Sequence, residues 1–306
     1  MVVPKIKIIL FLYILFASTI AYSQLDSITN SKTEFNPRRL SFVILSESAC
    51  FSATMTGLYQ LWYKDYDRAS FHFFNDSKEW LQMDKIGHIY TSYYFSKICK
   101  TGFQWTGMNN KKSAIYGSGV GLLFISSIEI FDGFSEKWGA SNADIIANIL
   151  GVGLYIGQEL TMEQQKIVPK FSFHKTEFAK YRSDALGKNF NEMIIKDYNG
   201  QTYWLSVNLY SFIKNDKIPE WLNFAVGYSA DGMLGGTENP SSWNKNILPY
   251  YDRKRQWYLS LDIDFTSFKT RSKFINTLFH VVNCVKVPFP AIEFEKNKIK
   301  PYLLYF

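Results

Sequence analysis

Apolar residues recur at helical spacing between about residues 38 and 165, where short polar or glycine-containing links divide them into four segments. Such periodicity predicts α-helices, and short links favour antiparallel neighbours. Asp76 followed by Glu79 resembles a capping box, which puts the start of the second helix near Asp76 and Asp84 in its interior. The pattern therefore predicts a hydrophobic four-helix bundle, with helices over residues 38–67, 76–100, 111–131 and 141–160.

The period of the pattern changes from about 3.6 to two after Pro169. In one such run Trp257 and Leu261 share one face and Ser260 and Asp262 share the other, which is typical of a half-buried strand. About five alternating runs are found, whereas a complete outer-membrane barrel needs about eight strands. We therefore expect a curved antiparallel sheet packed on the bundle. The remaining runs are 202–212, 221–230, 291–296 and 301–306.

The chain begins with the features of a secretory signal peptide. Lys5 and Lys7 precede an apolar run that ends at Ala21-Tyr22-Ser23. An uncleaved anchor helix is the alternative, and Gln24 in place of a cysteine offers no site for lipid attachment. We expect an exported α+β protein in the periplasm or outer membrane of a bacterium. Its predicted regions are a signal peptide (1–23), a helical bundle domain with a polar cluster (24–168) and a strand-rich C-terminal region (169–306).

Composition narrows the expected partners. The formal net charge is +7, and the basic residues are scattered rather than gathered in a patch, which argues against nucleic-acid binding. A basic exported protein suits membrane lipid or a cell-envelope polymer, with protein partners left open. Cys50, Cys99 and Cys284 are widely spaced, so we expect three buried apolar residues, with one disulfide and one free thiol as the alternative.

Polar residues within the apolar helices are the candidate functional residues. His88 lies four residues after Asp84 and three after Lys85, so these side chains share one helix face. Glu129 lies near the end of the third expected helix, and antiparallel packing brings that end level with His88. The predicted site residues are His88, Glu129, Asp132, Asp144, Lys85, Asp84 and Asn148.

An imidazole beside two or three carboxylates is a general acid–base system or part of a divalent-metal site. We expect His88 to act as general base or metal ligand, with Glu129 and Asp144 as its partners. Lys85 would hold an anionic group. The same residues also fit a structural interpretation, in which buried polar groups satisfy one another's hydrogen bonds. The sequence leaves open whether a metal binds and whether the site is catalytic.

Three segments resemble a known family: DKIGH (84–88), IEIFDGFSEKWGASNADIIAN (128–148) and KDYNGQTYWLS (196–206). They are similar to the YfiM-like family of uncharacterised bacterial envelope proteins, described as predicted periplasmic lipoproteins. The order DKxxH, acidic helix end and DxxxN is also loosely similar to VanZ-like membrane proteins. The resemblance implies that the seven site positions are shared, and it brings no established reaction. The chain departs from the lipoprotein label at Gln24.

Two hypotheses follow. In the first, the bundle holds a His–carboxylate site that binds, hydrolyses or transfers a lipid-linked or cell-wall molecule. In the second, the chain is a non-catalytic outer-membrane or periplasmic scaffold whose polar cluster locks the helices together.

Overall fold

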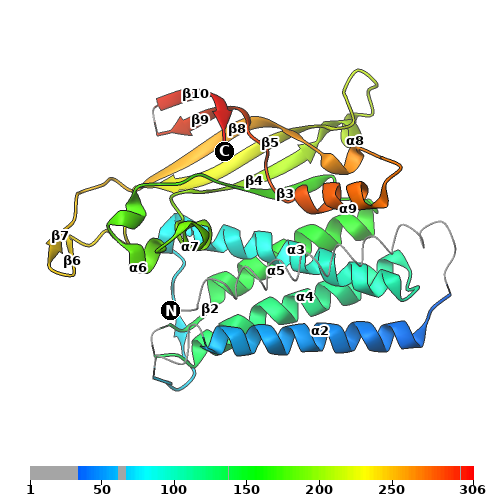
Figure 1. Cartoon of the computed structure of the whole chain (residues 1–306), viewed down its shortest axis with the longest axis horizontal. Helices are drawn as coiled ribbons and strands as arrows, with labels where there is room; N and C mark the ends of the chain where they lie inside the picture. The colour runs from blue at the N-terminus through cyan, green and yellow to red at the C-terminus, as the bar shows by residue number, and fades with distance from the viewer. Residues whose placement is uncertain (1–33, 61–66, 137, 297) are drawn as a thin grey trace. The chain divides into compact units, whose positions relative to one another are not determined.

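The computed structural model describes residues 34–60, 67–136, 138–296 and 298–306. It confirms the α+β class, with helices in the N-terminal part and a six-stranded antiparallel sheet in the C-terminal part (Figure 1). The chain divides into two compact units. The helical unit takes in the described chain up to Ser77 and His88–Gln165, and the sheet unit takes in Lys78–Gly87 and Lys166–Phe306.

Four long helices shape the helical unit. Asn36 caps the first of them, because its side chain accepts hydrogen bonds from the backbone N–H groups of Arg38 and Arg39. The α-helix ends at Leu58 and continues as a π-helical turn through residue 60. Residues 61–66 of the predicted helix lie outside the described chain, and residue 67 is not helical. The helices are α2 (Pro37–Leu58), α3 (Met83–Trp105), α4 (Asn110–Gly133) and α5 (Asn142–Thr161).

The predicted start of the second helix near Asp76 is wrong. Helix α3 begins at Met83, after the short turn η2 (Glu79–Gln82), and Asp84 therefore lies in its first turn. Trp80 and Leu81 have positive φ angles, which interrupt a right-handed helix. Bonds distant in sequence hold this backbone: the Trp80 N–H donates to the Gly236 carbonyl, and the Leu81 carbonyl accepts from the Tyr228 hydroxyl.

Glycines bring α4 and α5 close to α3. A Cβ atom on Gly117 would lie 2.2 Å from the backbone nitrogen of Lys100, and one on Gly121 would lie 2.9 Å from that of Ser96. Residue numbers rise along α4 as their partners fall along α3, so these two helices are antiparallel, as predicted. A Cβ on Gly151 of α5 would lie 2.2 Å from the Ile89 carbonyl oxygen.

The sheet unit is a meander in which each strand pairs with its neighbour along the chain, in the order β10-β9-β8-β5-β4-β3. Strand β3 and the amphipathic helix α9 (Lys273–Val282) were not predicted. A two-residue strand β1 (Phe73–Phe74) pairs with β2 (Ala140–Ser141) in the helical unit, and β6 (Ser242–Trp243) pairs with β7 (Asn246–Ile247). The six strands are β3 (Ile167–Phe173), β4 (Gln201–Asn208), β5 (Leu222–Asp231), β8 (Lys254–Ile263), β9 (Phe289–Glu295) and β10 (Lys298–Tyr305). Short helices and turns connect them: η3 (Phe178–Lys180), α6 (Ser183–Leu186), α7 (Phe190–Lys196), α8 (Leu209–Ile213) and η4 (Phe265–Ser267).

The alternation predicted in β8 is present, and the buried face is the polar one. Asp262 is fully buried and Ser260 nearly so, whereas Trp257 and Leu261 on the opposite face are exposed. The core beneath the polar face is aromatic, with the rings of Trp204, Tyr258 and Tyr305 in mutual contact. None of the three cysteines, all of which the structure describes, forms a disulfide. Only Cys99 is buried, so the expectation of three buried thiols is correct for that residue alone.

Candidate acid–base site

The candidate site centres on the imidazole of His88, one turn into α3. Its Nδ1 lies 3.1 Å from Asn148 Oδ1 and 3.8 Å from Glu129 Oε1, and its Nε2 lies 3.8 Å from Asp144 Oδ1. Glu129 comes from α4, and the other two come from α5. Three helices therefore bring these side chains to one level of the helical unit.

Helix direction explains this convergence. The antiparallel α4 places Glu129, near its C-terminal end, beside the N-terminal part of α3 that carries His88. Helix α5 runs parallel to α3, since His88 meets Asn148 and Lys100 meets Glu159, its Nζ lying 2.6 Å from Oε2. The first turn of α5 therefore lies beside the start of α3.

Glu129 is almost fully buried. Burial raises the pKa of its carboxyl group to about 8; the nearby Asp144 and Asp132 raise it further, while His88 and the backbone N–H of Ser141 oppose the shift. That N–H donates to Glu129 Oε2 at 3.4 Å. Glu129 is therefore largely protonated at neutral pH and can donate a proton.

Ser141 caps α5, because its Oγ accepts from the backbone N–H of Asp144 at 3.0 Å. Its hydroxyl donates to Asp76 Oδ1 at 2.5 Å. Capping therefore accounts for the backbone of Asp144. It does not account for the carboxylate of Asp144, which faces His88 Nε2. The role of Asp76 as acceptor for this capping hydroxyl was not predicted, because Asp76 lies 65 residues away in sequence.

Asp84 lies one turn before His88 on α3 and is held from two sides. Lys85 Nζ is 2.9 Å from Asp84 Oδ2, and the hydroxyl of Tyr198 donates to Oδ1 at 2.8 Å. Lys85 is itself buried, which fits a cation held by carboxylate rather than by water. Tyr198 was not singled out as a site residue, although the segment 196–206 that carries it is one of the family-like segments.

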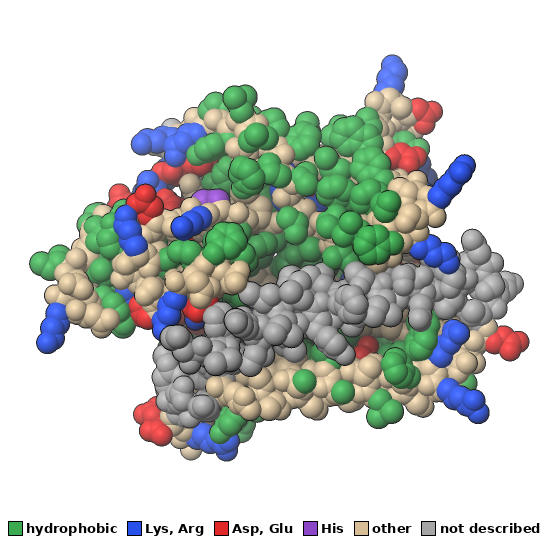
Figure 2. Space-filling view, viewed as in Figure 1, with side chains coloured by type: hydrophobic (Ala, Val, Ile, Leu, Met, Phe, Trp, Pro, Cys, Tyr) green, Lys and Arg blue, Asp and Glu red, His purple; other side chains and the backbone are tan. Residues whose placement is uncertain are grey.

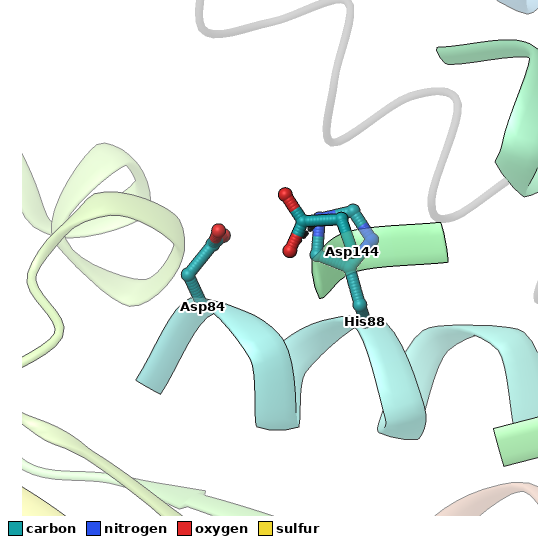
Figure 3. Close-up of side chains that lie close together, drawn as sticks. All are labelled: Asp84, His88 and Asp144. Carbon is teal, nitrogen blue, oxygen red and sulfur yellow. Dashed lines mark ion pairs between the residues drawn. The ribbon is translucent and has the colours of Figure 1, made fainter. Parts of the chain in front are cut away.

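One ligand atom each from Asp84, His88 and Asp144 lie within 4.8 Å of one another, a separation that a divalent cation could bridge (Figure 3). With Nδ1 donating to Asn148, a neutral His88 presents the Nε2 lone pair toward the Asp144 carboxylate. Two acceptors facing each other favour a proton or a cation between them. Oxygen and imidazole ligands suit several divalent ions.

Asn148 and Asp132 complete the predicted set. Asn148 is fully buried, and among the described residues its Nδ2 has no hydrogen-bond partner. Rotating the amide would direct Nδ2 to His88 and free Oδ1 as a further ligand. Asp132 is half-buried one turn after Glu129, and its charge adds to the raised pKa of Glu129.

Comparison with known families bears on this region of the chain. Residues 72–156 match the family of predicted periplasmic lipoproteins (DUF2279). The match covers rather more than a quarter of the chain and includes all seven predicted site residues. It agrees with the predicted location in the periplasmic envelope, and it names no reaction. Neither the curated proteins nor the solved structures contain a match to the chain.

Proposed function

We propose that this chain is a cell-envelope protein whose helical unit acts on a lipid-linked or cell-wall molecule by hydrolysis or transfer, with His88 as general base. The observation that carries the proposal is the position of the His88 imidazole between two carboxyl groups, each 3.8 Å from a different ring nitrogen. An imidazole placed between an orienting carboxylate and a second acid is a recurrent acid–base arrangement.

The two carboxyl groups take different roles because their surroundings differ. Glu129, with its pKa raised to about 8 mainly by burial, remains protonated at neutral pH and would serve as the proton donor to a leaving group. Asp144 would stabilise the imidazolium once Nε2 has taken up a proton. His88 keeps 20% of its side chain exposed, so a water molecule or substrate hydroxyl can reach it.

Lys85 and Asp84 would define the edge of the site. Lys85 would form an ion pair with an anionic group of the substrate, and its present ion pair with Asp84 would weaken. A divalent cation bridging Asp84, His88 and Asp144 is a second form of the same site, since their ligand atoms are close enough. Such an ion would supply Lewis-acid chemistry, and these three residues would hold it.

The exterior of the helical unit supports a substrate attached to lipid. Ile115, Leu123 and Ile130 of α4 and Ile146 and Leu150 of α5 are exposed. Among the described residues α4 alone is long and apolar enough to cross a membrane, a test that core helices of soluble proteins also pass. The finer resemblances to YfiM-like and VanZ-like proteins stay predictions and point to the same setting.

A scaffold role is the second candidate, and the fully buried Asn148 favours it because buried amides often lock helices together. The test compares His88→Gln and Glu129→Gln with His72→Gln, whose ring bonds the Trp138 carbonyl outside the cluster. Folding is followed by circular dichroism and thermal unfolding, and function by envelope integrity in cells that lack the native copy.

We expect both cluster variants to fold with envelope defects, and His72→Gln to complement. If the cluster variants fold and complement fully, the acid–base proposal is wrong. If they lose thermal stability by more than 10 °C, the scaffold candidate replaces it. Metal analysis of the purified chain distinguishes the two forms of the site: a stoichiometric divalent ion that is lost in Asp144→Asn selects the metal-bridged form.

A further inference from the structure

The two faces of the six-stranded sheet differ in polarity: the inner face buries charged side chains around an aromatic cluster, and the outer face leaves aliphatic side chains partly exposed. On the outer face the strand register aligns Leu205, Val226, Leu259 and Ile292 across four strands. The next row aligns Val207, Phe224 and Leu261. Every residue in these two rows is apolar.

The inner face carries polar and charged residues beside the aromatic cluster of Trp204, Tyr258 and Tyr305. Its rows are Lys170-Trp204-Gly227-Tyr258-Glu293-Lys300 and Asn208-Asn223-Asp262. Lys170 and Asp262 are fully buried as an ion pair at 2.8 Å. Lys286 is also buried, 4.0 Å from the same carboxylate.

A sheet in water buries its apolar face, because each Å² of apolar surface removed from water stabilises the fold by about 25 cal/mol. Burying charged groups, in contrast, costs free energy. Here the charges are buried, and aliphatic side chains of the other face remain partly exposed, whereas Tyr228 of that face is buried against Leu81 and Met83. Leu205, Val226, Trp257, Leu261 and Ile292 each keep between 37% and 52% of their surface exposed. Polar-in and apolar-out alternation is the pattern that hydrocarbon surroundings impose on a curved sheet.

Other features of the sheet unit agree with hydrocarbon surroundings. Helix α9 exposes Phe274 and Leu278. Figure 2 shows hydrophobic side chains gathered over the strands and this helix. From Trp257 to Ile263 the face extends about 20 Å at roughly 3.3 Å per residue, which is comparable with the depth of one leaflet and shorter than a full bilayer core of about 30 Å.

We propose that the outer face of the sheet, defined by Leu205, Val226, Trp257, Leu261 and Ile292, lies against the acyl chains of a lipid bilayer. A second copy of the chain, seated face to face, is the competing occupant. The proposal does not depend on whether His88 is catalytic, because it rests on the register and burial of the sheet alone.

Two tryptophans on opposite faces of this sheet provide the direct test. Trp257 lies on the outer face, and Trp204 lies on the inner face with its Nε1 donating to Ser172. The full chain is reconstituted into phosphatidylethanolamine and phosphatidylglycerol vesicles, with and without brominated acyl chains. The contribution of each tryptophan is obtained by difference from Trp257→Phe and Trp204→Phe.

We expect acyl bromines to quench the Trp257 contribution at least twofold and to leave the Trp204 contribution within 10–20%. If Trp257 is quenched by aqueous iodide and not by acyl bromines, the face lies in water and the proposal is wrong. If Val226→Cys forms a disulfide between two copies in the vesicles in high yield, a second copy occupies the face, and the proposal is likewise overturned.

A charge substitution gives an independent measurement for the case in which Trp204→Phe does not fold. Leu261→Lys puts a cation on the proposed face, and Ile247→Lys puts one on the β7 strand, where Ile247 is exposed outside the sheet. We expect Leu261→Lys to weaken partition into vesicles at least tenfold and Ile247→Lys to change it less than twofold. Equal partition of both variants with wild type refutes the proposal.

Discussion

Glu129→Gln should abolish a large pH dependence of stability. In the unfolded chain this carboxyl group has a pKa of 4.5, and in the folded chain burial raises the pKa to about 8. A raised acid pKa means that folding takes up a proton between these two values. The contribution is therefore fully favourable below pH 4.5 and is lost as the pH rises towards 8.

The magnitude follows from the two pKa values. Each pKa unit corresponds to about 1.4 kcal/mol, so wild type should lose about 3–4 kcal/mol of unfolding free energy between pH 5 and pH 8 through this group. Glutamine is nearly isosteric and cannot ionise, so the variant should lack this component. The difference in unfolding free energy between the variant and wild type should therefore shift in favour of the variant between pH 5 and pH 8.

The assay is urea unfolding of the purified full chain in one detergent with a chelator, followed by circular dichroism at pH 5, 6, 7 and 8. Glu159→Gln is the matched control on α5. Although burial alone would raise the pKa of Glu159, hydrogen bonds from Lys100, Gln165 and Asn110 hold it below its ordinary value. Its substitution should therefore destabilise the chain at neutral pH. Parallel pH profiles for wild type and Glu129→Gln would refute the reasoning.

Two further predictions concern packing and buried charge. Gly151→Ala should destabilise the chain by about 2 kcal/mol or more, because the new Cβ would lie 2.2 Å from the Ile89 carbonyl oxygen. Gly153→Ala should be neutral or slightly stabilising, because the space around its Cβ is open. Thermal unfolding of the two variants checks this prediction. Lys170→Met should lower the free energy of unfolding in urea by about 3–5 kcal/mol, because it removes the cation that lies 2.8 Å from the buried Asp262 carboxylate. The double variant Lys170→Met/Asp262→Leu should recover most of that loss. Additive losses in the double variant would contradict the second prediction.

The sequence predicted the helical part well because helical spacing and the short links between helices carry most of the relevant information. Gly117 and Gly121 identify the α3–α4 contact, and this contact then brings His88 level with Glu129. The start of α3 could not be predicted in the same way. Local capping signals at Asp76 compete there with bonds from Trp80 and Leu81 to residues more than 140 positions away.

The sheet shows a different limit. Alternation in 256–268 predicts a strand with two unlike faces, and it contains no information on which face is buried. The choice depends on the surroundings of the folded chain, which a single strand does not encode. Helix α9 was missed because a ten-residue apolar run is ambiguous between helix and strand.

The meander order of the sheet has a consequence for biogenesis. Every strand of the sheet pairs with the sheet strand before it in chain order, so no pairing waits for a strand from the far end of the chain, although the connections before β4, β8 and β9 are long. A polypeptide that emerges from a translocon N-terminus first can therefore add these strands successively, without waiting for its last residues. The segment Lys78–Gly87, which belongs to the same compact unit, emerges earlier and is already present when its partners Tyr228 and Gly236 follow.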